Sequence, residues 1–240
     1  HADDEVAAVL AGQFRCYVSR RAEGEPIAYI TGRREFFGLD LVVTPDVLIP
    51  RPETELLVEL ALEKIAHDAE ARIADLGTGS GAIALALAHE RPRARVLATD
   101  ASGAALAVAE SNARRLGLAN VEFAQGEWCA ALDDREFDLI ASNPPYIALG
   151  DAHLDQGDLR FEPALALSSG SDGLDAIRTI ARDAHRHLVR GGWLLFEHGY
   201  DQGAAVRDIL AVHGYVDAAT VRDIEARDRV TGARYAGDTA

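Results

Sequence analysis

The hydrophobic pattern changes its period near residue 72, and the part before it predicts two helices joined by a hairpin. Residues 4–21 should form a helix whose apolar face consists of Val6, Val9, Leu10, Phe14 and Val18. Residues 27–32 mix turn and β formers and predict a linker, whereas 35–43 predict a hairpin that turns at Gly38. The next helix should begin at 51–55, because proline and glutamate side chains suit the positive end of a helix dipole.

After residue 72, short apolar runs alternate with amphipathic segments. The predicted strands are 73–76, 95–99, 121–124, 137–142, 193–197, 215–222 and 229–235, and the predicted helices are 82–89, 102–116, 174–188 and 202–213. Helical crossovers imply parallel strands, and two strands that follow each other directly imply a hairpin. We therefore expect an α/β fold with a doubly wound, mostly parallel seven-stranded sheet and an antiparallel edge hairpin. Ligands of such sheets bind beyond the carboxyl ends of the strands.

Composition places the chain among ordinary soluble proteins. Of its 240 residues, 48% are hydrophobic and 26% are charged, which suits one α/β domain with a small appendage. No apolar run approaches the roughly 20 residues of a membrane span, and no signal peptide opens the chain. Cys16 and Cys129 lie far apart without metal-ligand spacing. We expect a cytoplasmic protein with no disulfide, no metal and no membrane association. Because the chain lacks methionine and starts at His1, we also expect a trimmed N-terminus.

The charge argues against a protein that binds nucleic acid broadly. The net charge is −15, from 24 basic and 39 acidic residues, and such a field repels phosphates at long range. Residues 15–51 are a local exception, because they hold six arginines against five acids. This stretch is either a solvated face of mixed charge or a surface for an anionic partner.

A glycine-rich stretch, Gly77-Thr78-Gly79-Ser80-Gly81, follows the first strand of the alternating part and opens a helix. Glycines at such a place allow a tight turn and the close approach of a ligand to the backbone. Because its spacing is G-x-G-x-G, it differs from the G-x-G-x-x-G fingerprint of the dehydrogenases. This difference disfavours a nicotinamide cofactor.

Two further residues follow neighbouring strands and suit a nucleoside. Asp100 ends the second strand, where a carboxylate can accept two ribose hydroxyls, although it could also cap the next helix. Trp128 follows the third strand and offers a flat apolar wall for an adenine ring, or is an ordinary buried tryptophan.

The fourth strand stops abruptly at Asn143-Pro144-Pro145-Tyr146. Two prolines remove two backbone donors and fix two φ angles, so the chain leaves the sheet in a stiff, extended form. The Asn143 side chain and the Pro144 carbonyl are then neighbouring hydrogen-bond acceptors. We expect them to hold the N–H groups of a planar amide or amine, with Tyr146 stacking on its plane.

Together these parts resemble the class I S-adenosylmethionine-dependent methyltransferases, in which Asn-Pro-Pro-Tyr marks enzymes that methylate amide or exocyclic amino nitrogens. A longer match is similar to the peptide chain release factor glutamine methyltransferases. It consists of the segments 24–32, 36–39, 48–55, 75–81, 142–147, 161–163, 172–174 and 199–203. The resemblance runs from about Gly24 to Arg234, nearly the whole chain.

The resemblance implies a Rossmann-like fold and an enzyme of translation termination. It implies that S-adenosyl-L-methionine donates a methyl group to the glutamine of a Gly-Gly-Gln motif in release factors, leaving S-adenosyl-L-homocysteine. By position, the cofactor site falls on Gly77, Thr78, Gly79, Ser80, Gly81, Asp100, Trp128 and Asn143. The substrate clamp falls on Asn143, Pro144, Pro145 and Tyr146, with Asn143, Pro144 and Tyr146 in catalytic roles.

The family carries an N-terminal bundle of several helices, whereas one helix precedes Gly24 here. We therefore divide the chain into a helical remnant (1–23), a linker with a β-hairpin (24–50) and a methyltransferase domain (51–240). Arg51 and Glu53 either line the site or start a helix. Asp75 is expected to fix the glycine stretch, and His198 is interpreted as structural.

Two other functions stay open at this point. An adenine-specific nucleic-acid amino-methyltransferase shares the Asn-Pro-Pro-Tyr chemistry, but it needs a basic cleft and a target-recognition insert. A non-catalytic docking module could retain the cofactor fold. Intact Asn143 and an intact glycine stretch disfavour the module, and the acidic composition disfavours the nucleic-acid enzyme.

Overall fold

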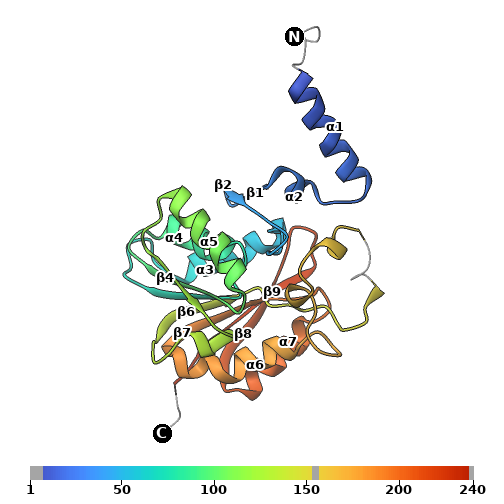
Figure 1. The fold of residues 1–240 in the computed structure, drawn as a ribbon. Coiled ribbons are helices and arrows are strands. Elements are labelled where there is room, and N and C mark those ends of the chain that lie inside the picture. The colour runs from blue at the N-terminus through green and yellow to red at the C-terminus, as the bar shows by residue number, and fades with distance from the viewer. Residues whose placement is uncertain (1–7, 153–156, 238–240) are drawn as a thin grey trace.

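The alternating part of the chain forms one seven-stranded sheet in a computed structural model that describes residues 8–152 and 157–237 (Figure 1). The strands are β3 (Arg72–Leu76), β4 (Arg95–Asp100), β5 (Val121–Gln125), β6 (Phe137–Ser142), β7 (Leu188–Glu197), β8 (Tyr215–Arg222) and β9 (Asp228–Tyr235). Their order is β5-β4-β3-β6-β7-β9-β8. All pairs from β5 to β7 are parallel, and β9 is antiparallel to both β7 and β8. The predicted fold class is confirmed.

Helices cover both faces of this sheet (Figure 1). They are α3 (Glu55–Lys64), α4 (Ala82–Glu90) and α5 (Gly103–Leu116) on one side, and α6 (Asp175–Ala184) and α7 (Gly203–Val212) on the other. Successive side chains of a strand alternate between the faces, so Ile73 joins the core under α3 and α4 while Ala74 joins the core under α6 and α7. The central strands are mostly apolar because both of their faces are buried, and Asp75 of β3 and Ser142 of β6 are buried polar exceptions.

The N-terminal part contains α1 (Ala8–Ala22), α2 (Ile27–Thr31), β1 (Arg33–Phe36) and β2 (Leu39–Val42). The predicted hairpin is confirmed and turns at 37–38, where both φ angles are positive. The predicted linker at 27–32 is wrong, because residues 27–31 form α2 and Gly32 is its C-cap. Tyr29 of this helix is buried, and its hydroxyl donates to the Val47 carbonyl at 2.7 Å. This tertiary contact outweighs the local preference for an extended chain.

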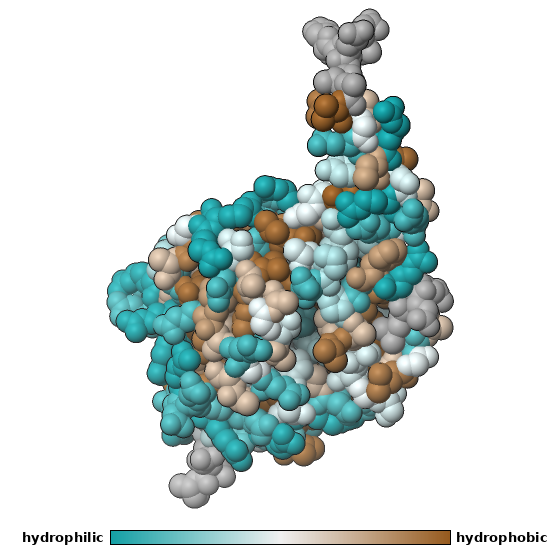
Figure 2. Space-filling view, viewed as in Figure 1, coloured by the Kyte–Doolittle hydropathy of each residue, from teal (hydrophilic) through white to brown (hydrophobic). Residues whose placement is uncertain are grey.

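Helix α1 extends away from the rest of the chain (Figure 1). It confirms the predicted helix over 8–21, while 4–7, including Val6, lie outside the described residues. Its apolar residues Val9, Leu10, Phe14 and Val18 are each more than half exposed. Figure 2 shows apolar surface among polar side chains on this helix.

The boundary between the predicted helix 174–188 and the strand 193–197 is wrong. The helix ends at Ala184, and β7 already begins at Leu188. Leu188 pairs with Phe137, and the register shifts before the next pair, Leu139 with Trp193, so a distant strand decides this boundary. Short 3₁₀ helices are η1 (Pro52–Thr54), η2 (Trp128–Ala131), η4 (Leu159–Phe161), η5 (Ala164–Ala166) and η6 (His185–His187). Within the described residues, none of the helices has the length and apolar content needed to cross a bilayer.

Candidate active site

Three of the predicted site segments meet at one edge of the sheet. The glycine stretch follows β3, Asp100 ends β4, and Asn143 follows β6. Because β3 lies between β4 and β6 and is parallel to both, the carboxyl ends of these strands are neighbours. The Ser142 hydroxyl reinforces this edge by donating to the Leu76 carbonyl at 2.7 Å.

The glycine stretch 77–81 needs its glycines for backbone conformation. Gly77, Gly79 and Gly81 have φ angles of 75°, 56° and 87°, a region that other residues rarely adopt. Thr78 and Ser80 between them are buried, with 6% and 2% exposure. Their side chains therefore point inward, and the stretch offers a ligand the accessible backbone of Gly77 and Gly79.

The buried Asp75 carboxylate fixes this stretch through hydrogen bonds. Its Oδ2 accepts hydrogen bonds from the Thr78 hydroxyl at 2.6 Å and from the Ala84 amide at 3.1 Å. Its Oδ1 is buried without a hydrogen-bond partner, and burial raises the pKa of Asp75 to about 7. These bonds support the interpretation that Asp75 fixes the glycine stretch.

Asp100 and Trp128 border the same stretch. The Asp100 carboxylate accepts from the amides of Gly79 and Ser102, both at 2.9 Å, and its side chain stays partly exposed. Its interpretation as the cap of α5 is wrong, since Ser102 occupies that position and accepts from the Ala105 amide. The Trp128 ring lies so close to Gly77 that an added Cβ there would come within 3.3 Å of it. A carboxylate, a flat aromatic wall and open glycine backbone fit a nucleoside-bearing cofactor.

The Asn-Pro-Pro-Tyr segment borders a cavity of about 60 Å³. The cavity is lined by Leu48, Arg51, Asn143, Pro144, Tyr146, Ile147, Leu159, Ala166 and Leu167. The lining comes from the segment before α3, the clamp itself and the connection between β6 and α6. Arg51 combines the two roles considered for it, because its side chain lines this cavity and the residue is also the N-cap of η1.

A buried hydrogen-bond network lies beside the clamp. Asn143 Nδ2 donates to Thr54 Oγ1 at 3.2 Å, and the Tyr146 hydroxyl donates to Glu197 Oε1 at 3.3 Å. The Gln202 amide donates to the Tyr146 carbonyl at 3.0 Å. Burial raises the pKa of Glu197 to about 7, while Arg229 and the Tyr146 hydroxyl oppose the shift. Sequence reasoning missed Thr54 and Glu197, although a glutamate that ends an apolar strand was a usable signal.

Glu162 ties the connection between β6 and α6 to the segment before α3. Its carboxylate is buried, accepts from the Ile49 amide at 3.0 Å and pairs with Arg51. Burial raises the pKa of Glu162 above its ordinary value, although Arg51 and the Ile49 amide favour the ionised form.

Most arginines of the basic stretch 15–51 are neutralised within the protein. The ion pairs are Arg20–Glu25, Arg21–Asp158, Arg33–Asp40 and Arg51–Glu162. This pattern favours a face of mixed charge over a surface for an anionic partner.

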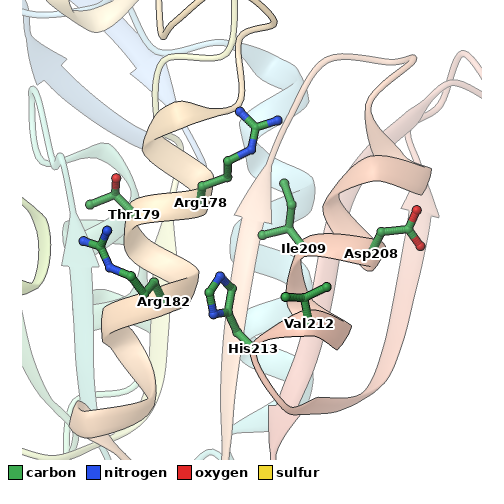
Figure 3. Close-up of a pocket in the computed structure, with 7 residues that line it drawn as sticks. All are labelled: Arg178, Thr179, Arg182, Asp208, Ile209, Val212 and His213. Carbon is green, nitrogen blue, oxygen red and sulfur yellow. The ribbon is translucent and has the colours of Figure 1, made fainter.

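A larger hollow of about 430 Å³ lies between α6 and α7 (Figure 3). It is lined by Arg178, Thr179, Arg182, Asp208, Ile209, Val212 and His213, none of which is a predicted site residue. Arg178 and Arg182 already pair with aspartates on or beside α6. Within the described residues, no three His, Cys, Asp or Glu side chains gather closely enough to hold a metal ion.

Comparison with known proteins gives two family matches. Residues 53–162 match the Methyltransferase small domain, and residues 1–32 match the PrmC N-terminal domain. The release factor glutamine methyltransferase of Xylella fastidiosa is 58% identical over 237 residues, which cover 99% of this chain and 86% of the relative. That of Pseudomonas aeruginosa is 54% identical over 224 residues, which cover 93% and 81%.

Solved structures at lower identity share the fold. A methyltransferase from Pyrococcus furiosus superposes with a TM-score of 0.63 at 19% identity, covering 94% of this chain and 100% of its own. A ribosomal protein L11 methylase from Lactobacillus delbrueckii subsp. bulgaricus has a TM-score of 0.56 at 24% identity, covering 77% and 78%.

Proposed function

The chain belongs to the release factor glutamine methyltransferases, and from this membership we propose what it does. It transfers a methyl group from S-adenosyl-L-methionine to the side-chain amide nitrogen of the glutamine in the Gly-Gly-Gln motif of peptide chain release factors. The observation that carries the proposal is the clamp, whose Asn143 and Pro144 line a small cavity at the edge that also holds the glycine stretch. A release factor as substrate implies a cytoplasmic location. We assign residues 51–240 as the catalytic domain, which includes the match of residues 53–162 to the Methyltransferase small domain.

The residues around the glycine stretch would hold the cofactor. The backbone of Gly77 and Gly79 is open to it, the Asp100 carboxylate suits the ribose hydroxyls, and the Trp128 ring suits one face of the adenine. When bound, S-adenosylmethionine supplies an electrophilic methyl group on a positively charged sulfur.

The clamp would orient the acceptor amide. A primary amide is a poor nucleophile because its nitrogen lone pair is delocalised into the carbonyl. Asn143 Oδ1 and the Pro144 carbonyl can each accept one N–H, which aims the nitrogen, and such alignment can lower a barrier by roughly 7–11 kcal/mol. The same acceptors stabilise positive charge that develops on the nitrogen. The departing proton becomes acidic only as the N–C bond forms, so the site needs no strong base.

The proposal is tested by incubating the protein with isotopically labelled S-adenosylmethionine and a release factor. Mass spectrometry should find one added methylene on the Gly-Gly-Gln glutamine, and a release factor with that glutamine replaced by asparagine should stay unlabelled. A parallel reaction with adenine-containing DNA tests the nucleic-acid alternative. Calorimetry that detects no cofactor binding would instead support a docking module.

A further inference from the structure

The far end of the clamp is held by other segments of the chain. Pro144 and Pro145 have no N–H, so two consecutive residues of the clamp cannot donate a backbone hydrogen bond. At the near end, the Ser142 hydroxyl fixes the chain to β3 through the Leu76 carbonyl. At the far end, the position of Tyr146 depends on groups that reach it from elsewhere in the fold.

The Gln202 side chain reaches that end and bonds three backbone segments. Its Nε2 donates to the Tyr146 carbonyl at 3.0 Å and to the Asp172 carbonyl at 3.2 Å. Its Oε1 accepts from the Gly199 amide at 2.8 Å. A carbonyl can only accept and an amide N–H can only donate, so these three partners admit one orientation of the carboxamide. Gln202 thus joins the clamp to the segment before α6 and to the turn after β7.

Gly173 lies against the same carbonyl. Its φ of 77° is in the left-handed region, and a Cβ added there would come within 2.1 Å of the Tyr146 oxygen and 2.8 Å of Gln202 Nε2. A side chain at this position would push one of these groups away. The close approach of the Gly173 backbone to the Tyr146 carbonyl therefore requires glycine.

The chain after Tyr146 is fixed as well. The Ile147 amide donates to the Leu167 carbonyl at 3.0 Å, and the Ile147 carbonyl accepts from the Ser169 amide at 2.9 Å. The Tyr146 carbonyl lies in the sequence between these bonds and the two prolines. Its bond to Gln202 therefore fixes the peptide plane that follows the Tyr146 Cα, and with it the direction in which the ring leaves the backbone.

We propose that Gln202 and Gly173 are positioning residues of the methyl transfer, which place the clamp by holding the Tyr146 carbonyl. The inference rests on the proposed function, in which the Tyr146 ring stacks on the acceptor amide while Asn143 and Pro144 accept its N–H groups. Neither Gln202 nor Gly173 touches the reacting atoms. A displacement of about 1 Å can lower a rate by about 100-fold, so a bond to the backbone of the clamp can affect turnover strongly.

This role also accounts for two segments that resemble the family without containing a predicted site residue. They are 172–174 and 199–203. The first supplies the glycine and a carbonyl partner of the carboxamide, and the second supplies the glutamine and its amide partner.

The kinetic test uses Gln202→Glu, because glutamate keeps an acceptor for the Gly199 amide and loses both donors. Its ionised carboxylate then faces the carbonyls of Tyr146 and Asp172, which repel it. In steady-state kinetics with release factor, kcat should fall by about 10- to 100-fold and KM should change much less. Gln202→Met has nearly the same length but no strong hydrogen-bonding group, and its kcat should fall as well. Cofactor affinity, measured by calorimetry, should not change.

A purely structural role gives a different result. If Gln202 only stabilised the turn after β7, Gln202→Glu would retain the wild-type kcat, and that outcome overturns the inference. The matched control is Asp201→Asn, which makes the reverse exchange of carboxylate and carboxamide on the exposed neighbouring side chain and should keep the wild-type kcat. Thermal unfolding shows that each variant is folded.

Gly173→Ala tests the second contact. Its methyl group must displace the Tyr146 carbonyl or the Gln202 carboxamide, so kcat should again fall by about 10- to 100-fold. The matched control is Gly214→Ala, because Gly214 has a φ of 81° and an added Cβ would meet no atom of the described residues within 4 Å. The control carries the backbone strain alone and should lower Tm without lowering kcat. Equal kcat values for the two variants would overturn the role of Gly173.

Amide hydrogen exchange gives a measurement that does not depend on activity. Loss of the bond to Gln202 should loosen the chain after the clamp, so the Ile147 amide should exchange about 2- to 10-fold faster in Gln202→Met. The Val96 amide, which donates to the Asn120 carbonyl near the start of β4, should exchange at the wild-type rate.

The exchange result separates this inference from the proposed function. Unchanged exchange of the Ile147 amide in Gln202→Met overturns the inference even if the wild type methylates release factor. If exchange becomes faster but the wild type methylates no release factor, Gln202 still anchors the clamp and the proposed function fails.

Discussion

Removal of the Glu162 carboxylate should loosen the connection that encloses the clamp cavity. Glu162 lies in the connection between β6 and α6, and both of its partners, Ile49 and Arg51, lie in the segment before α3. Arg51 and Leu159 line the cavity from these two sides. Glu162→Ala leaves the Ile49 amide without its acceptor and Arg51 without its counter-ion, so the two walls of the cavity lose their main polar link.

The structure sets the size of the effect. An unsatisfied buried amide costs about 1–3 kcal/mol, and breaking a buried ion pair costs about 3–5 kcal/mol. Because the Arg51 side chain is 31% exposed and can reach water, the combined loss should stay near the lower end, at about 3 kcal/mol. For a protein of this size, such a loss lowers Tm by about 6–12 °C.

The matched control is Asp158→Ala. Asp158 pairs with Arg21 in the same connection at 3.1 Å, but these side chains are 45% and 48% exposed, so the pair should contribute at most about 1 kcal/mol. Calorimetric unfolding at pH 8 compares the two variants, and steady-state kinetics should show a higher KM for release factor in Glu162→Ala. A Tm of Glu162→Ala no lower than that of Asp158→Ala would refute the reasoning.

Three further substitutions test the site. Asn143→Ala should lower kcat by about 10²–10³-fold, with little change in the cofactor affinity measured by calorimetry. Its control is Asn120→Ala, which removes a side chain that donates to three backbone carbonyls and should lower Tm but not kcat. The raised pKa of Asp75, about 7, means that its stabilising contribution is complete below about pH 4 and is lost as pH rises through 7. Asp75→Asn should therefore gain up to about 4 kcal/mol over the wild type above pH 7 and nothing near pH 4, as measured by urea unfolding. Gly81→Ala forces an alanine to φ 87° and places its Cβ 2.9 Å from Leu85, so its free energy of unfolding in urea should fall by roughly 1–2 kcal/mol or more. An unchanged free energy of unfolding would contradict the strain.

The alternating part of the fold followed from local pattern. Apolar runs of strand length, separated by segments with helical spacing of apolar residues, were enough to predict the sheet and its antiparallel edge. Gly38 was enough to predict where the hairpin turns. Local pattern failed at 27–32 and at the start of β7. In both places a distant partner decides the structure: Val47 accepts from the Tyr29 hydroxyl, and Phe137 pairs with Leu188.

The sequence by itself determined the positions of the glycine stretch, Asp100 and Asn143 at strand ends, because backbone conformation and strand length depend on a few neighbouring residues. Only the tertiary structure decided that Thr54 and Glu197 lie behind Asn143 and Tyr146, residues 89 and 51 positions away from them. The pKa of a carboxylate and the direction of a hydrogen bond depend on what surrounds the group. For Glu197 those surroundings come from η1, β9 and Tyr146 after β6, which meet only when the sheet is complete.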